Sequence, residues 1–451
     1  MSTSVSPTQN RPPTGRAHPV LTLLTWIGLL VGGSRIHAHI NITEFPVDMA
    51  VYREGVRAFI SGGEMYSVPM QVADLQLPFI YPPFGALILV PLTAPEWLTD
   101  DLAGDVMIVV SNLLILACLH LIFRTVMKDH SPAAARAVTA VSWAGVMLIE
   151  PVELNNGFAQ INVIVLALVF FDLMPRKRFL PQGTLLGVAA AIKLSPLAMG
   201  LFFLVRRDVR AIVVAGVSAV VCTVIAALVR WDATVEFFST TLRGMGTESE
   251  FGVNTAYQSN SSIKGVIMRF FNSQELLDAH GTLANVLWLV FSLLAIGLGA
   301  WLMVALLRRE LMADAILVNA TVMLLISPVS WSHHWVWLAL LIPLAAWRCV
   351  TLFHRPWFLG AVLAVWSWLI LTDPPKWWYG DAIDVFALSI VQKVLVSDFV
   401  WLALLSWIGL SLALRTVPTS AGSVAVERFG FGARDNDETP AASREATGAE
   451  A

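Results

Sequence analysis

The sequence predicts an all-α membrane protein whose chain crosses the bilayer many times, and three observations support this. Of the 451 residues, 57% are hydrophobic and 14% are charged, whereas soluble domains have about 45–50% and about 25%. The mean hydropathy is +0.70. Apolar runs follow one another almost from end to end, separated by short clusters of charge, proline and glycine. A soluble enzyme, a nucleic-acid-binding protein and a disordered scaffold are therefore disfavoured.

We expect about 12 transmembrane helices in a single domain over 19–414, because each crossing needs about 20 mostly apolar residues. The apolar runs that predict them are 19–34, 105–123, 137–149, 160–174, 183–192, 197–205, 211–229, 283–306, 313–326, 335–347, 357–372 and 386–414. The polar tails 1–18 and 415–451 are predicted to be disordered and cytoplasmic.

Lysine and arginine predict the orientation, since cytoplasmic loops retain positive charge. This rule places inside the basic clusters at 124–136, 176–178, 206–210, 308–309 and 348–355. The long loops 35–78 and 230–282 then face outward, as do the short loops 96–104, 150–159 and 327–334, which contain no lysine or arginine. Structure outside the membrane is expected in the two long loops, in part as amphipathic helices.

Two apolar segments do not fit single crossings under this orientation. The segment 79–95 has outward loops on both sides, and its prolines favour a broken helix that re-enters the membrane. The segment 183–205 has basic flanks on both sides, so we expect two short half-helices that meet near Lys193 and Pro196. Irregular backbone at membrane depth is tolerated only against protein or a wet cavity, which predicts a cavity beside Lys193.

The first outward loop carries a carboxylate at the start of a helix. Val51, Gly55, Ala58 and Phe59 recur at helical spacing and predict an amphipathic helix on the membrane surface. Asp48 stands at its start, and two roles are open. It is either an N-cap carboxylate bonded to the first turn, or a general base at the mouth of a membrane cavity, placed to accept a proton from a hydroxyl.

Further polar side chains lie next to or within apolar segments. Tyr81 belongs to the aromatic, proline-rich stretch 77–84, which is either a stiff lead-in to the apolar segment or part of a site. Gln160 and Asn162 open a helix, where amides either bond neighbouring helices or line a sugar site. Lys193 either snorkels to the interface or anchors a phosphate, because an ammonium buried among apolar residues is costly.

The second outward loop and the segment near 333 add two more candidate groups. Asn260, Ser262 and Lys264 are either part of an ordinary surface loop or donors to a phosphate or sugar. His333 and His334 stand at the outward end of a membrane helix. Adjacent helical residues point about 100° apart, so the pair cannot easily bind one metal, and no metal site is predicted. The imidazoles either sit in the interfacial aromatic belt, or one of them contacts a phosphate or orients a catalytic carboxylate.

The motifs and their order resemble glycosyltransferase family 87 of the GT-C membrane glycosyltransferases. The motifs are an acidic residue before V-Y-R at 51–53, L-P-F-I-Y-P-P at 77–83, Q-I-N at 160–162, A-A-A-I-K-L-S-P at 189–196, N-S-S-I-K-G-V at 260–266 and S-P-V-S-W-S-H-H at 327–334. The resemblance covers roughly residues 45–350. Within the family, the motifs resemble the actinobacterial polyprenyl-phosphate-mannose-dependent α-(1→2)-mannosyltransferases of phosphatidylinositol mannoside synthesis.

The resemblance implies a GT-C fold and mannose transfer, with inversion, from a polyprenyl-phosphate-mannose donor to a phosphatidylinositol mannoside at the outer side of the plasma membrane. It implies that Asp48 is the catalytic base. The residues expected to bind the donor phosphate or sugar are Tyr81, Gln160, Asn162, Lys193, Asn260, Ser262, Lys264, His333 and His334. Where many relatives read N-Q-S, this chain reads N-S-S at 260–262, so no role is carried over to Ser261.

The expected partners are the lipid donor, the glycolipid acceptor and membrane lipids, with no nucleic acid. Neither a nucleotide nor a metal cofactor is expected. Three alternatives remain at this stage. One is the same fold acting on another lipid-linked sugar such as arabinofuranose, and another is a lipid or solute transporter. The third is a non-catalytic membrane scaffold, which would leave the costly Lys193 unexplained.

Overall fold

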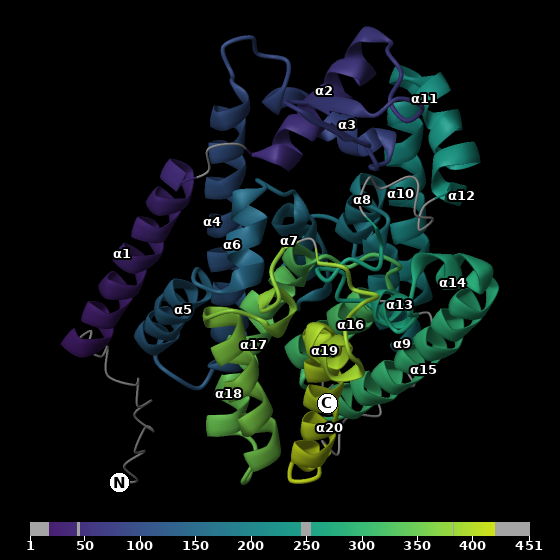
Figure 1. The fold of residues 1–451 in the computed structure, drawn as a ribbon. Helices are drawn as coiled ribbons and strands as arrows, with labels where there is room; N and C mark the ends of the chain where they lie inside the picture. The colour runs from purple at the N-terminus through teal and green to yellow at the C-terminus, as the bar shows by residue number, and fades with distance from the viewer. Residues whose placement is uncertain (1–17, 43–45, 245–253, 382, 420–451) are drawn as a thin grey trace, which may run out of the picture.

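The computed structural model describes residues 18–42, 46–244, 254–381 and 383–419, which are mainly helical (Figure 1). Within these ranges the only sheet is a two-stranded antiparallel hairpin, in which β1 (Met70–Val72) pairs with β2 (Leu75–Leu77). The all-α class predicted from composition is confirmed. The tails predicted to be disordered lie outside the described residues, apart from residue 18 and residues 415–419.

Long helices alternate with short ones along the chain. The longer helices are α1 (Pro19–Ile42), α2 (Val47–Ser61), α4 (Asp100–Val126), α5 (Pro132–Val146), α7 (Asn162–Leu173), α10 (Val209–Val229), α15 (Gly281–Leu307), α16 (Met312–Ile326), α17 (Leu338–Thr351), α18 (Trp357–Leu371) and α20 (Asp398–Leu414). The shorter ones are α3 (Pro83–Leu89), η1 (Val90–Leu92), α6 (Glu150–Gly157), α8 (Thr184–Ile192), η2 (Ser195–Gly200), α9 (Leu201–Val205), α11 (Trp231–Glu236), η3 (Phe237–Thr241), α12 (Leu242–Gly244), α13 (Ile263–Arg269), α14 (Gln274–Ala279), η4 (Ser332–Trp337), η5 (Pro375–Trp377) and α19 (Ile390–Val396).

The described residues contain 6 helices long and apolar enough to cross a membrane, or up to 8 if each of two bent pairs is one span. The bent pairs are α5 with α6, at 68°, and α19 with α20, at 71°. The chain is a multi-pass membrane protein, as its composition predicts. Several predicted runs form apolar helices of only 10–17 residues, so the figure of about 12 crossings stays a prediction.

Neither segment that was expected to be irregular forms one long helix: 79–95 contains a single short helix, and 183–205 is broken at Lys193. In 79–95, α3 and η1 together form a short apolar helix, Pro83–Leu92. Ten residues rise about 15 Å, which is half of a hydrocarbon core of about 30 Å. In 183–205, α8 ends at Ile192, Lys193 adopts an extended conformation with φ −149° and ψ 135°, and the 3-10 helix η2 follows. The two half-helices predicted around Lys193 are therefore present.

The helix predicted near 49–59 is present as α2, but its apolar face packs against the protein, whereas the prediction had it lie on the membrane surface. Tyr52, Val56 and Phe59 are buried there. Gly55 allows the ring of Phe79 to approach the helix backbone, since a Cβ atom at this position would lie 2.2 Å from the ring. The helix ends at Gly62, whose φ of 84° lies in the left-handed region that glycine adopts without strain.

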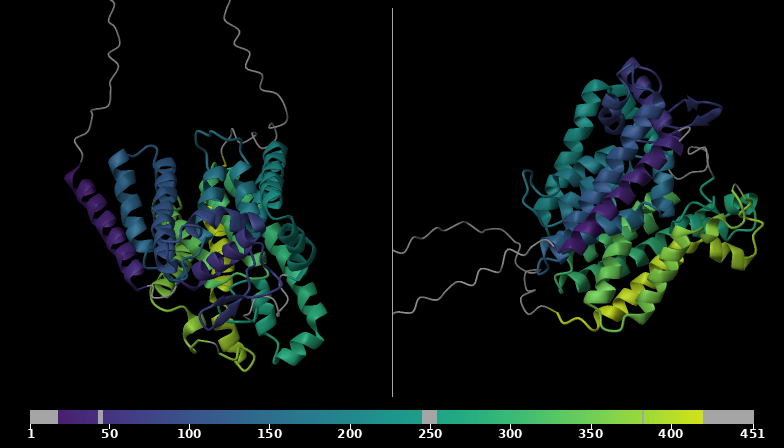
Figure 2. Two further views of the ribbon diagram at one scale, coloured as in Figure 1. Left: turned by 90° about the horizontal axis from the view of Figure 1, so that it is seen from above. Right: turned by 90° about the vertical axis from the view of Figure 1, so that its left-hand side faces the viewer.

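The connecting loops gather at two ends of the molecule. At one end, Arg309 donates to the carbonyl of Val417. At the other, Arg53 pairs with Asp100 at the start of α4. Figure 2 shows the β-hairpin and α2 on the opposite side of the molecule from the beginning of α1 and the end of α20. The candidate site described next belongs to the region beneath α2.

Candidate active site

Asp48 lies in the first turn of α2, where its carboxylate is half-buried and accepts a hydrogen bond of 2.5 Å from Gln160 Nε2. The helix begins after Pro46, so Asp48 is not its N-cap residue. Burial raises the pKa of the Asp48 carboxyl to about 6, although the Gln160 hydrogen bond and the charge of Lys193 act to lower it. A carboxyl group with a pKa near the working pH is suited to accept a proton.

Two tyrosines surround the amide that binds Asp48. Tyr52, one turn along the same face of α2, donates to Gln160 Oε1 over 2.6 Å. Its hydroxyl oxygen also lies 2.9 Å from that of Tyr81. The backbone presents Gln160 through a tight turn after α6, in which Ala159 has a φ of 51°. The amide is therefore engaged at both ends and oriented with its donor toward the carboxylate.

Lys193 contacts the ring of Tyr81 from the break between α8 and η2. Its Nζ donates to Asn162 Oδ1 over 2.8 Å and lies 3.2 Å from His334 Nε2. The same ammonium lies 5.3 Å from the centroid of the Tyr81 ring, a cation–π contact. The predicted cavity beside Lys193 is present, with a volume of about 30 Å³, and its polar lining includes Asn162, Ser330 and His334.

The two histidines lie in the 3-10 helix η4, which leads into α17. Their rings are perpendicular, with centroids 4.8 Å apart. The ring of His333 also packs against Phe158 at 5.3 Å. Buried His333 Nε2 has no hydrogen-bond partner among the described residues. Within the same ranges, no group of three or more His, Cys, Asp or Glu side chains could hold a metal ion.

A continuous series of contacts therefore joins Asp48 to the histidines. It passes through Gln160, Tyr52, Tyr81 and Lys193, and it draws on α2, the start of α3, the start of α7, the α8–η2 break and η4. A carboxylate with a raised pKa lies at one end, and an ammonium beside imidazoles lies at the other. This arrangement can accept a proton at one end and stabilise negative charge at the other.

Residues 79–328 match the sequence model of glycosyltransferase family 87. The chain belongs to this family. The resemblance drawn from the motifs is thus confirmed, and the protein is a glycosyltransferase. The matched segment includes Tyr81, Gln160 and Lys193, whereas Asp48 precedes it and His333 follows it.

Curated relatives extend the similarity beyond this segment. A protein from Mycolicibacterium smegmatis, named polyprenol-phosphate-mannose-dependent alpha-(1-2)-phosphatidylinositol mannoside mannosyltransferase, is 31% identical over 342 residues, covering 71% of this chain and 73% of the relative. A protein of the same name from Mycobacterium tuberculosis is 32% identical over 339 residues, covering 71% and 74%. The solved structure of ArnT from Cupriavidus metallidurans bound to undecaprenyl phosphate covers 91% of this chain and 77% of its own, with 16% identity and a TM-score of 0.43.

The polar residues at 260–264 lie next to the segment that precedes the histidines. Asn260 is fully buried, donates to the carbonyls of Thr255 and Pro328, and accepts from the backbone of Ser330. Ser262 caps α13. The ammonium of Lys264, in the second long loop, lies 5.2 Å from the centroid of the Trp288 ring, a cation–π contact. The contacts of Asn260 and Ser262 are thus with the backbone of their own loop and of the segment before the histidines.

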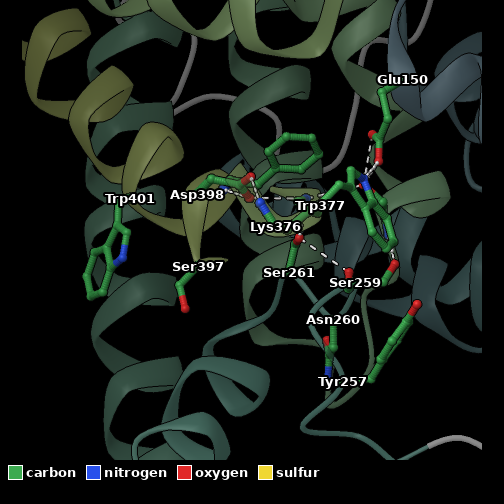
Figure 3. A network of polar contacts seen from close by, with 12 residues as sticks. Glu150, Tyr257, Ser259, Asn260, Ser261, Lys376, Trp377, Ser397, Asp398 and Trp401 are labelled. Atoms are coloured by element: carbon green, nitrogen blue, oxygen red, sulfur yellow. Dashed lines mark hydrogen bonds and ion pairs between the residues drawn. The ribbon is translucent and has the colours of Figure 1, made fainter. Parts of the chain in front are cut away.

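Sequence reasoning missed one buried group of this glycosyltransferase. Lys376 is fully buried and lies 3.1 Å from Asp398. A lysine flanked by proline and tryptophan at the end of an apolar helix has the pattern of an interfacial, snorkelling residue, so nothing local marks it as buried. Glu150, in the predicted outward loop 150–159, was not a predicted site residue either, although Trp377 donates to it over 2.8 Å. Figure 3 shows these groups together.

Proposed function

We propose that this glycosyltransferase moves mannose from polyprenyl-phosphate-mannose to a phosphatidylinositol mannoside and forms an α-(1→2) bond with inversion. The names of the two mycobacterial relatives support the donor, the acceptor class and the linkage. The structural observation that carries the proposal is the series of contacts that joins Asp48, through Gln160 and the two tyrosines, to Lys193 and the neighbouring His334. A lipid-linked donor also accounts for an active site built between apolar helices.

In the proposed reaction, Asp48 accepts the proton of the acceptor hydroxyl as that oxygen attacks the anomeric carbon of mannose. The bond between the anomeric carbon and the phosphate oxygen breaks, and polyprenyl phosphate leaves with the electron pair. Lys193, His333 and His334 stabilise the charge that grows on the departing phosphate. Attack opposite the phosphate converts a β-linked donor into an α-linked product.

The remaining site residues orient these groups. Gln160 holds the Asp48 carboxylate through a direct hydrogen bond, and Asn162 holds the Lys193 ammonium. Tyr81 lies between the two ends and offers a ring and a hydroxyl to the sugar. We propose no metal and no nucleotide in the reaction. We also propose that the site opens to the outer side of the plasma membrane, which the absence of lysine and arginine from loops 150–159 and 327–334 supports.

The proposal is tested with purified protein, a radiolabelled polyprenyl-phosphate-mannose donor and phosphatidylinositol mannoside acceptors. We expect Asp48→Asn to lower kcat by about 100-fold or more, the effect of losing a general base, without a change in thermal stability. Asp74→Asn removes an exposed carboxylate from the same loop and serves as the matched control. Full transfer by Asp48→Asn would overturn the assignment of the base.

The same assay separates the alternatives. A wild-type protein that transfers arabinofuranose from its lipid carrier, but not mannose, would overturn the donor sugar. Movement of the lipid-linked sugar across vesicle membranes without formation of a glycosidic bond would overturn the glycosyl-transfer proposal and support transport.

A further inference from the structure

A buried ionic cluster lies behind the histidines. Lys376 is fully buried, and the neighbouring Asp398 is 5% exposed. The ammonium bonds with three groups: the carboxylate of Asp398 at 3.1 Å, the hydroxyl of Ser261 at 2.8 Å and the hydroxyl of Ser332 at 3.2 Å (Figure 3). An ammonium has three N–H donors, so these contacts use its full capacity. Lys376 therefore has no donor left for a ligand.

Ser332 connects this cluster to a second carboxylate. Its hydroxyl accepts from Lys376 and donates to Glu150, whose two oxygens lie 2.6 and 2.8 Å away. The indole of Trp377 donates to the same carboxylate. The Ser332 hydroxyl thus joins the loop that carries Lys376 to the start of α6. It also immediately precedes His333 in the chain.

Residues 259–261 also bond to the segment before the histidines. The backbone N–H of Ser261 donates to the Ser330 carbonyl over 2.7 Å, and the backbone N–H of Ser332 donates to the Ser259 hydroxyl over 3.1 Å. The Lys376 ammonium then links Ser261 to Ser332 through their hydroxyls. The segment before the histidines is therefore fixed by backbone and side-chain contacts from three separate loops.

A buried ionic cluster is a poor way to stabilise a fold. Removing charges from water is costly, and an apolar replacement of similar volume is often neutral or stabilising. Buried ionic groups can instead specify one arrangement of the groups around them. Here the arrangement specified is that of η4, which places His334 3.2 Å from Lys193.

We infer that Lys376 is a positioning residue of the donor site: through the Ser332 hydroxyl it sets the place of His333 and His334 relative to Lys193. This inference rests on the proposed function, in which these side chains bind the donor phosphate. Lys376 contacts no reacting atom. Its effect is expected on the binding of the phosphate, not on the binding of the acceptor.

The decisive variant is Ser332→Ala, which removes the bridging hydroxyl without removing a charge. We expect the KM for polyprenyl-phosphate-mannose and the Kd for a polyprenyl monophosphate to rise about tenfold, the effect of losing one hydrogen bond to a charged group. The KM for the acceptor should not change. Ser332→Thr keeps the hydroxyl and should restore both values. Ser406→Ala, which removes another buried hydroxyl, from α20, is the matched control and should behave as the wild type.

Lys376→Met leaves the buried Asp398 and the half-buried Glu150 without their cation and is expected to impair folding, so the serine series decides the question. Unchanged donor KM and monophosphate affinity in Ser332→Ala would overturn the inference. Equal losses for donor and acceptor, or equal losses in Ser406→Ala, would also overturn it, because they indicate general destabilisation. If the wild type binds the monophosphate but transfers no mannose, the proposed function fails while the binding series still tests the positioning role.

Discussion

Burial and neighbouring groups act on the Asp48 carboxyl in opposite directions. Burial raises its pKa to about 6, and the Gln160 amide and the Lys193 charge hold the pKa lower than burial alone would set it. A base must be deprotonated to accept a proton, so activity should fall as the pH drops through about 6. Because the hydrogen bond from Gln160 lowers the pKa of Asp48, the pH at which activity falls on the acid side (the acid limb of the pH profile) depends on this bond.

We expect Gln160→Leu to move this acid limb to higher pH. Removing a donor that stabilises the carboxylate raises the pKa of Asp48, so less of the base is available at any given acidic pH. The expected shift is about one pH unit, since a hydrogen bond to a charged group is worth about 1.5 kcal/mol and one unit corresponds to about 1.4 kcal/mol. The measurement is kcat/KM for mannose transfer from acid to neutral pH.

The control for this experiment is Gln182→Leu, which removes an amide that bonds to the carbonyl of Asp172 at a different place. Its profile should match that of the wild type. An unshifted limb in Gln160→Leu, or a shift to lower pH, would show that Asp48 is not the group that titrates.

The sequence identifies single residues better than it identifies their partners. Lys193 stands out because an ammonium in an apolar hairpin is unusual, whereas a carboxylate at a helix start is ordinary, so only the family resemblance gave Asp48 its expected role. The partner of Asp48 lies 112 positions away, and His334 lies 141 positions from Lys193. No local sequence pattern predicts contacts between residues so far apart in the chain. The same reason explains why Lys376 was missed, since its burial depends on side chains from three other parts of the chain.

At the scale of the element, Arg230, the residue directly after α10, holds the C-terminal end of α2 in place. Arg230 Nη1 donates to the carbonyls of Ala58 and Phe59, and Nη2 donates to that of Gly63 over 3.0 Å. Asp232 orients the guanidinium from the other side. These carbonyls lie in the last turn of α2 and just beyond it, where the negative end of the helix dipole makes a cation favourable. Arg230 therefore holds the helix that carries Asp48.

We expect Arg230→Met to lower both thermal stability and kcat, the latter by about tenfold, which corresponds to about 1.4 kcal/mol of transition-state stabilisation. Arg230→Lys should recover only part of the lost kcat and stability, because an ammonium keeps the charge but cannot reproduce the planar set of donors of a guanidinium. The assays are thermal inactivation and mannose transfer. Arg309→Met, which removes an arginine bonded to carbonyls at the other end of the molecule, should leave kcat unchanged. A wild-type kcat in Arg230→Met would show that α2 is held by its other contacts alone.

Secondary-structure elements were predictable where basic flanks or the spacing of apolar residues indicated them. Basic flanks on both sides of 183–205 predicted the break at Lys193, and apolar spacing predicted α2. The hairpin β1–β2 was not predicted, although Met70, Val72, Leu75 and Leu77 alternate with polar residues around a short turn. Ala73 occupies that turn with a φ of 50°, a conformation that its side chain does not favour. Residue preference alone therefore gave no signal for the turn.

At the scale of the whole molecule, composition was sufficient to predict a multi-pass membrane protein, but not its number of crossings. Charge cannot distinguish a short helix buried among others from a spanning one. The contacts between loops do separate two ends. His354 bonds with Thr416 and Arg309 with Val417 at one end, whereas the α2 region lies at the other. These two ends are expected to face opposite sides of the membrane.

Labelling of single cysteines tests this orientation. Asp74 is exposed in the β1–β2 turn, near α2. Lys177 is exposed just after the C-terminal end of α7, a helix about 18 Å long that begins at Asn162. In a background in which Cys118, Cys222 and Cys349 are replaced by serine, we expect Asp74→Cys to react with a membrane-impermeant maleimide in intact cells. Lys177→Cys should react only after permeabilisation, because its loop carries the basic cluster 176–178. The reverse pattern would place the site on the cytoplasmic side and exclude mannose transfer at the outer surface.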